Sequence, residues 1–278
     1  MCFCARGGAQ VKRNSVRPLN CVMSKPSWSL RRFRLLVGSR RDTESTLNAE
    51  AAANGLVRES HFASFHAYEA ISVVDAARRT EIKPGEGPGM AAFRQFMDEF
   101  LPGDGDRPLR EASFKAAAHS IAFFRSLHAA TDLLAPVIYW GLGLREELAK
   151  PLSEASINPT NVASALASLH SHSKVEASLL ELLSNPSFKY VRALSNSTKH
   201  RSLVPAGFSV SYDFSPDPKH GVRIGRFQYG QEYSPRWVSD YIQDCYPDVI
   251  RGMIAVGRAV NADLASQPRL TIEQSGLT

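Results

Sequence analysis

Residues 110–139, REASFKAAAHSIAFFRSLHAATDLLAPVIY, decide the fold class of this chain. Apolar, small or half-polar side chains recur along this stretch every three to four residues, the spacing of one face of a helix. The face they form consists of Phe114, Ala117, Ala118, Ile121, Phe124, Leu127, His128, Thr131 and Leu134. We therefore expect a long helix with this face in the core and a kink or an end at Pro136.

Further helical patterns lie on both sides of this stretch. They cover residues 61–79, with Phe62, Phe65 and Ile71 as expected core contacts, and residues 90–100. Others follow Asn158-Pro159 and Asn185-Pro186, and the last one extends from about residue 235 to 260. Residues 207–214 and 222–229 alternate with period two around a turn-rich loop, which predicts a β-hairpin. The sequence thus predicts a mainly α protein, a helical bundle with one β-hairpin inserted before the last helix.

Charge divides the chain unevenly. Residues 1–41 contain ten lysines or arginines and no acidic residue, so the rest of the chain carries a net charge of −4. We predict a basic, disordered N-terminal segment at 1–55 and a helical domain at 56–278. Because that domain has an acidic balance, any contact with a nucleic acid must be local or must come from the N-terminal segment.

Three interpretations of the N-terminal segment stay open. Its arginine-rich, acid-free composition is typical of an organellar transit peptide. Alternatively, translation starts at Met23 and residues 1–22 are never made, or the segment is a basic arm that binds nucleic acid. The expected location is cytoplasmic, with organellar import as the alternative.

Several kinds of site find no support in the sequence. Cys2, Cys4 and Cys21 lie in the N-terminal segment and only Cys245 in the domain, which leaves no disulfide framework for the core. Motifs for phosphate loops, dinucleotides and metal ligands are missing, so we expect no cofactor and no metal. No apolar run reaches the ~18–20 residues of a membrane span, and we expect no membrane partner.

One short motif carries chemistry, the run Asn196-Ser-Thr-Lys199-His200-Arg201. In a continuous helix Arg192, Asn196 and His200 would lie along one face, because they are four residues apart. A histidine there could deprotonate a ribose hydroxyl while an arginine stabilises charge on the phosphate. The alternative is structural, because cations at the C-terminus of a helix also complement the helix dipole.

The motif and the helical layout together resemble the HEPN superfamily. That resemblance implies a compact helical bundle, often a homodimer, with the activity of a metal-independent ribonuclease. It implies catalytic roles for His200 as base, Arg192 as the arginine and Asn196 as the polar, orienting residue, and RNA phosphate binding by Lys199 and Arg201. The family motif has four to six residues between arginine and histidine, whereas seven separate Arg192 from His200.

Two functions follow from this resemblance. The first is RNA binding or cleavage, in which the 2′-hydroxyl attacks the phosphate without a metal. The second is a non-catalytic helical interaction module, a degenerate HEPN domain in which the same residues form a helix cap and a polar dimer contact. RNA cleavage that depends on His200 separates the two.

Overall fold

The computed structural model describes residues 27–77, 84–100, 108–200, 204–211 and 218–269. The helices are α1 (Leu30–Gly38), α2 (Thr43–Ala77), α3 (Pro88–Phe100), α4 (Pro108–Asp132), α5 (Leu134–Leu142), α6 (Leu144–Glu147), α7 (Pro159–Leu169), α8 (Ser173–Ser184), α9 (Pro186–His200), α10 (Val238–Asp240) and α11 (Tyr246–Ser266). The strands are β1 (Ala206–Val210), β2 (His220–Ile224), β3 (Phe227–Tyr229), β4 (Gln231–Tyr233) and β5 (Arg236–Trp237). The predicted class, mainly α with strands inserted before the last helix, is confirmed.

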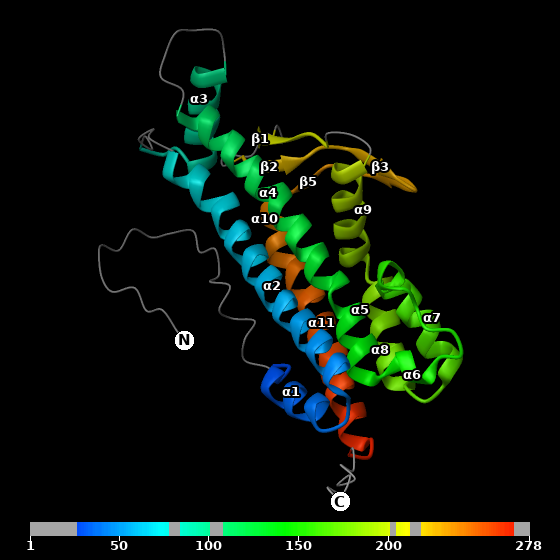
Figure 1. Cartoon of the computed structure of the whole chain (residues 1–278). Coiled ribbons are helices and arrows are strands. Elements are labelled where there is room, and N and C mark those ends of the chain that lie inside the picture. The colour runs from blue at the N-terminus through cyan, green and yellow to red at the C-terminus, as the bar shows by residue number, and fades with distance from the viewer. Residues whose placement is uncertain (1–26, 78–83, 101–107, 201–203, 212–217, 270–278) are drawn as a thin grey trace, which may run out of the picture.

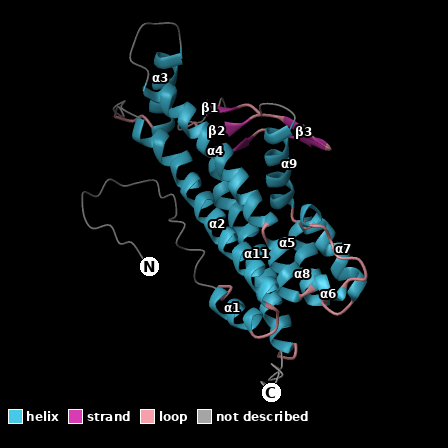
Figure 2. Cartoon of the chain, viewed as in Figure 1, coloured by secondary structure: helices cyan, strands magenta, loops and turns pink. Residues whose placement is uncertain are grey.

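Two long antiparallel helices, α2 and α4, lie side by side along the length of the molecule (Figure 1). Helix α11 packs against α5 and α8, and α1 packs against α2 and α11. Helices α5 to α8 gather at the end of the bundle near α1, whereas α9 and all described strands lie toward the other end (Figure 2). The strands therefore meet α9 and α4 away from the chain termini.

Small side chains line the contact between α2 and α4. The buried side of α2 is mostly alanine, and α4 turns Ala112, Ala116 and Ser120 inward. Side chains this small let two helix axes approach closely. The larger core residues lie further along α4 and beyond it, where Phe123 and Phe124 contact the ring of Tyr241.

The buried face of α4 differs from the predicted one in its first half. Phe124, Leu127, His128, Thr131 and Leu134 are buried as expected. The structure corrects the expectation for Phe114, which is 77% exposed, and for Ala118, which is also exposed. On α2, Phe62 and Phe65 are 46% and 52% exposed rather than core residues. The physical reason is the alanine-lined contact, which leaves no room for phenylalanine.

The chain breaks between α4 and α5 at Leu133, three residues before the expected Pro136. Pro136 lies in the first turn of α5, where a backbone N–H has no helical partner and its loss costs little. The prediction that this proline interrupts the helical run is thus confirmed, with the break one turn earlier.

Residues 27–55 form α1 and the first part of α2 and pack onto the core, which corrects the prediction of a disordered segment up to residue 55. Phe33 and Val37 of α1 are fully buried, and α2 continues across residue 56 without interruption. Phe33 packs on α5, where a Cβ at Gly141 would lie 3.1 Å from its ring. The basic composition is misleading because the arginines of α1 point outward while two apolar side chains one turn apart point inward. Residues 1–26 lie outside the described part of the chain.

Arg41, one of the arginines of this basic segment, makes hydrogen bonds within the fold. Its Nε donates a hydrogen bond of 3.0 Å to the carbonyl of Gly141, and its Nη2 donates to the carbonyl of Leu142 and to the side chain of Gln267. These carbonyls end α5, where a cation is favourable. An arginine that a composition argument assigns to a free arm therefore joins α5 to the end of α11.

The predicted hairpin is confirmed for β1 and β2, which pair antiparallel with Phe208 opposite Val222. Strand β5 adds to β2 at Ile224. The predicted second strand, 222–229, is divided in two, because β3 pairs with β4 in a separate hairpin that turns at Gly230, with φ of 70°. Residues 212–214 of the predicted first strand lie outside the described residues.

The last helix is interrupted before it becomes regular. A π-helical turn, Tyr241–Cys245, separates α10 from α11. Pro247 follows in the first turn of α11, where it has no N–H to donate to the preceding turn. The predicted last helix, from about residue 235 to 260, is therefore present, but its first turns are not regular α-helix.

One helical run of the described chain, Arg110–Leu142, is long and apolar enough to cross a membrane by length and composition. The buried half of its apolar window contacts the other helices of the bundle, and core helices commonly pass the same test. The run is therefore weak evidence for a membrane span.

Candidate functional site

Helix α9 carries most of the predicted site residues on a regular backbone. The side chain of Asn185 caps its first turn by accepting hydrogen bonds of 2.8 and 3.3 Å from backbone N–H groups. The helix is continuous to residue 200. Arg192, Asn196 and His200 therefore follow one another along one face, as the four-residue spacing predicts.

The predicted residues differ in how the helix presents them. Arg192 and Lys199 are exposed, and Asn196 is half-buried. The backbone of His200 ends α9, but its side chain lies outside the described residues, as does all of Arg201. Arg192, Asn196 and Lys199 thus all lie on α9, and the position of the His200 imidazole is not described.

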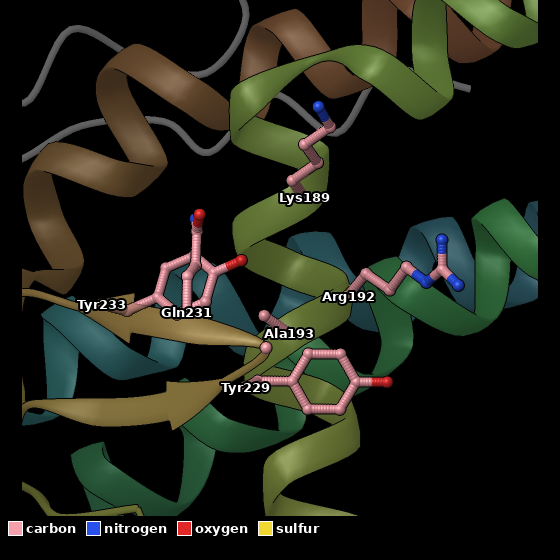
Figure 3. A pocket seen from close by; sticks show the side chains of 7 residues that line it. Lys189, Arg192, Ala193, Tyr229, Gln231 and Tyr233 are labelled. Carbon is pink, nitrogen blue, oxygen red and sulfur yellow. The ribbon is translucent and has the colours of Figure 1, made fainter.

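An open pocket with a volume of about 310 Å³ lies between α9 and the β3–β4 hairpin (Figure 3). Its lining includes two cationic side chains and no acidic one. It is formed by Lys189, Arg192 and Ala193 of α9 and by Tyr229, Gly230, Gln231 and Tyr233 of the hairpin. Cationic nitrogens, phenol groups and an amide suit an anionic ligand with a flat apolar part.

Asn196 connects the helix to the hairpin. Its Nδ2 donates a hydrogen bond of 3.1 Å to the hydroxyl of Tyr229. In Figure 3 the guanidinium of Arg192 and the hydroxyl of Tyr229 extend to the same side of α9. The polar residue of the motif thus orients a tyrosine beside the arginine, a role that the sequence alone did not indicate.

The second tyrosine of the pocket is held by ring stacking. Tyr233 lies parallel to Phe227, with ring centroids 4.8 Å apart and an interplanar angle of 6°. Tyr190 of α9 meets both rings edge-on. One side of the pocket is therefore a fixed aromatic wall rather than a loose loop.

Beneath α9, helix α4 contributes a second pair of titratable groups. His128 is only 5% exposed, and burial first, then the nearby Lys199 and Arg192, lowers its pKa to about 4. The His128 Nε2 lies 3.7 Å from Asp132 Oδ1, while Nδ1 has no hydrogen-bond partner among the described residues. Partial burial raises the pKa of Asp132, and Lys199 and Arg192 oppose that shift. At neutral pH the site therefore combines neutral His128 with the charges of α9.

Ser195 occupies the position that the predicted motif would give to its arginine if four residues separated the arginine from His200. Here Ser195 is fully buried and its hydroxyl has no partner among the described residues. A guanidinium at that position would be buried in the core, whereas position 192, nearly one turn earlier, faces the pocket.

The sequence did not indicate three residues of this site, Lys189, Tyr229 and Tyr233. Lys189 is on the same helix as the motif, two turns before Asn196, and its spacing could have suggested a role. The tyrosines are far from the motif in sequence, and only the packing of the β3–β4 hairpin on α9 brings them near. His128 was expected as a core histidine, and only its proximity to Arg192 and Lys199 links it to the site.

The chain matches no protein-family model, no curated protein and no solved structure. The resemblance to the HEPN superfamily therefore stays a prediction that rests on residues 192–201 and on the helical layout.

Proposed function

We propose that this protein binds single-stranded RNA in the pocket between α9 and the β3–β4 hairpin. The observation that carries the proposal is the pairing of exposed cations, Arg192 and Lys189, with a tyrosine wall, Tyr229 and Tyr233, in one open pocket. Phosphate and an unpaired base need these two kinds of partner side by side.

The charge distribution supports local binding. Beyond residue 41 the chain carries a net charge of −4, so its overall charge balance does not favour nucleic-acid binding over a wide face. The pocket nevertheless contains two cations and no acidic lining residue. Arg192 can form two parallel hydrogen bonds to a phosphate, and Lys189 supplies a second, less directional charge.

The aromatic wall favours an unpaired nucleotide over a duplex. A base within a helix offers no free face to a side chain, whereas a single-stranded base can stack on a tyrosine ring. Such stacking is worth about 1–3 kcal/mol for each base. A volume of about 310 Å³ is at the small end of the pockets that hold small ligands. The pocket thus suits one nucleotide of a longer strand.

Cleavage is the activity that the motif predicts for an RNA bound here. His200 follows Asn196 by four residues on the same helix, and it would take the proton of the 2′-hydroxyl as that oxygen attacks phosphorus. Arg192 would stabilise the charge that develops on the phosphate. The bond from phosphorus to the 5′-oxygen would break as that oxygen takes up a proton from water or from the protonated base. The predicted products are a 2′,3′-cyclic phosphate and a 5′-hydroxyl, and no metal is required.

Binding is tested by the fluorescence anisotropy of a labelled single-stranded RNA with the full chain, at about 50 mM and about 200 mM salt. We expect Arg192→Gln and Lys189→Gln each to weaken binding by about fivefold to tenfold. Each should also reduce the slope of log affinity against log salt concentration by about one. The matched control is Arg258→Gln, because Arg258 is an exposed arginine on α11. Equal affinity of all four proteins would contradict the proposal.

Tyr229 separates stacking from hydrogen bonding. Tyr229→Ala removes the ring, and we expect binding to weaken by about tenfold or more. Tyr229→Phe keeps the ring and loses only the hydroxyl that accepts from Asn196. It should therefore retain most of the affinity. If both variants bind like the parent, the aromatic wall has no part in binding.

Cleavage is tested with the same RNA in EDTA, beside His200→Ala and Arg192→Ala proteins whose folding is checked by circular dichroism. Loss of 2′,3′-cyclic phosphate products in both variants supports a nuclease. Binding without cleavage supports RNA binding alone. If the protein neither binds nor cleaves the RNA, that result supports the second hypothesis, the non-catalytic interaction module.

A further inference from the structure

Helix α2 carries a row of four charged and aromatic side chains, of which three are exposed and Glu69 is half-buried. Arg58, Phe62, Phe65 and Glu69 are spaced by four, three and four residues, so they lie on one face of the helix. Phe62 and Phe65 are 46% and 52% exposed, and Arg58 is exposed. We call these four residues the α2 stripe. It extends over about 16 Å of helix.

The stripe faces away from the core. The opposite face of α2 buries Ala63, Ala67 and Ala70. In Figure 1, α2 forms an outer edge of the bundle, with α4 beside it. The chain thus leaves two phenylalanine rings at the edge of the bundle, in the middle of its longest described helix.

Two histidines hold the Phe65 end of the stripe in place, and α2 and α4 expose two further aromatic rings. The Nδ1 atoms of His66 and His119 lie 2.9 Å apart, which fixes α2 against α4 at this level. The ring of Phe65 packs edge-on against both imidazoles. Tyr68 on α2 is 62% exposed, and Phe114 on α4 is 77% exposed. Exposed aromatic rings beside charged groups on one helix face are typical of an interaction surface.

The order of the stripe is self-complementary. Read along α2 it is cation, aromatic, aromatic, anion. When a second copy of α2 runs antiparallel about a two-fold axis midway between Phe62 and Phe65, Arg58 faces Glu69 of the second copy, and Phe62 faces Phe65 of the second copy. A two-fold interface uses the same patch on both subunits, so it requires a pattern that matches its own reverse.

We propose that the α2 stripe is the centre of a two-fold interface between two copies of this chain, in which α2 packs antiparallel on α2 of the second copy. Two Arg–Glu pairs flank four phenylalanine rings in this arrangement. An unrelated helical partner would need only an apolar face and would not require charges in mirror order. The charge order therefore favours a second copy as the occupant.

A charge exchange tests the register. Arg58→Glu places two glutamates opposite each other at both ends of the interface, and Glu69→Arg does the same with arginines. We expect each variant to raise the dimer dissociation constant by about tenfold or more, as sedimentation equilibrium of the full chain would show. The double variant R58E/E69R restores opposite charges at both ends, and it should recover most of the parental dissociation constant.

Two further variants keep the test decisive. Phe62→Ser with Phe65→Ser should give a folded monomer, because both side chains are half-exposed and contribute little to the core. Arg258→Glu reverses an exposed arginine on α11 and should leave the dimer unchanged. The proposal is overturned if the parent stays monomeric at concentrations of about 100 μM, which is far above the dissociation constants of specific dimers. It is also overturned if the dimer survives the phenylalanine changes, or if R58E/E69R is no tighter than the single variants.

Discussion

His172 and His128 are both almost fully buried, yet their surroundings shift the two imidazoles in opposite directions. His172 is 3% exposed, with Nδ1 3.0 Å from Asp263 and Nε2 3.2 Å from Glu147. Burial acts to lower the pKa of His172, but the hydrogen bonds and charges of these carboxylates outweigh it and raise that pKa. His128 has no such pair of carboxylates, and burial lowers its pKa to about 4.

The His172 network predicts stability that depends on its protonation. The charged imidazolium can donate to both carboxylates, whereas the neutral ring can donate to only one. Because the folded pKa is raised, this stabilisation is full below the unfolded value of about 6.5 and is lost as the pH rises through the folded pKa. We expect His172→Gln to lower the free energy of unfolding by about 3 kcal/mol at mildly acidic pH, and by less at alkaline pH. Urea unfolding of the parent and of His172→Gln across a pH series measures the difference in unfolding free energy at each pH. If that difference does not vary with pH, the His172 network does not depend on protonation.

For His128 we expect the opposite dependence of stability on pH. Its depressed pKa means that the neutral ring stabilises the fold above about pH 6.5, and that this contribution declines as the pH falls toward about 4. The free energy of unfolding falls by about 3 kcal/mol through this group between those two pH values. We expect His128→Leu to unfold with a weaker dependence on pH in this range. NMR titration of the ring gives an independent check, since an imidazole that gains its proton near pH 6.5 is incompatible with this burial.

At the scale of elements, α1 shows how a short basic helix can belong to a core. Ser29 caps it by accepting from the backbone N–H of Arg32 at 3.2 Å. Phe33 and Val37, one turn apart, are fully buried, while Leu35 on the outer face is 67% exposed. The helix is thus amphipathic, with arginines on its outer face.

This geometry predicts a contrast between two substitutions on the same helix. Phe33→Ala removes a buried ring that packs against Gly141, and we expect it to lower the free energy of unfolding by about 3–5 kcal/mol. Leu35→Ala removes an exposed side chain and should change it by less than about 0.5 kcal/mol. Chemical denaturation of the two variants measures the contrast. Equal stability would mean that α1 is not docked.

Helix α9 illustrates what an element can and cannot reveal alone. Its four-residue spacing was enough to place Arg192 and Asn196 on one face. Of its partner in the pocket, the β3–β4 hairpin, β3 was predicted only as the end of a longer strand and β4 was not predicted. In the structure the chain turns at Gly230, and Phe227 of β3 packs edge-on against Tyr190 of α9, a contact that no local pattern predicts.

At the scale of the whole molecule, the N-terminal boundary is the feature that packing changed most. A chain of residues 56–278 would lack α1 and residues 43–55 of α2, including the buried Ala49, Ala52 and Ala53. It would also lose the contacts of Arg41 with α5 and Gln267.

We therefore expect residues 56–278 to unfold at least about 10 °C below the full chain, or without a cooperative transition. Thermal melts followed by circular dichroism measure this difference. If the shortened chain melts within a few degrees of the full one, α1 and the start of α2 are dispensable, contrary to their burial.

The sequence by itself determined the helical class, the place of the strands before the last helix, and the common face of Arg192 and Asn196. These features depend on periodicity and turn residues, which are local. Only the tertiary structure decided that residues 27–55 join the core, that Phe62, Phe65 and Phe114 face outward, and that Tyr229 meets Asn196. The physical reason is that, when a helix has apolar residues on several faces, the shape of the neighbouring helix determines which face is buried. Here α2 and α4 approach through alanine and serine, so the aromatic rings remain on the surface.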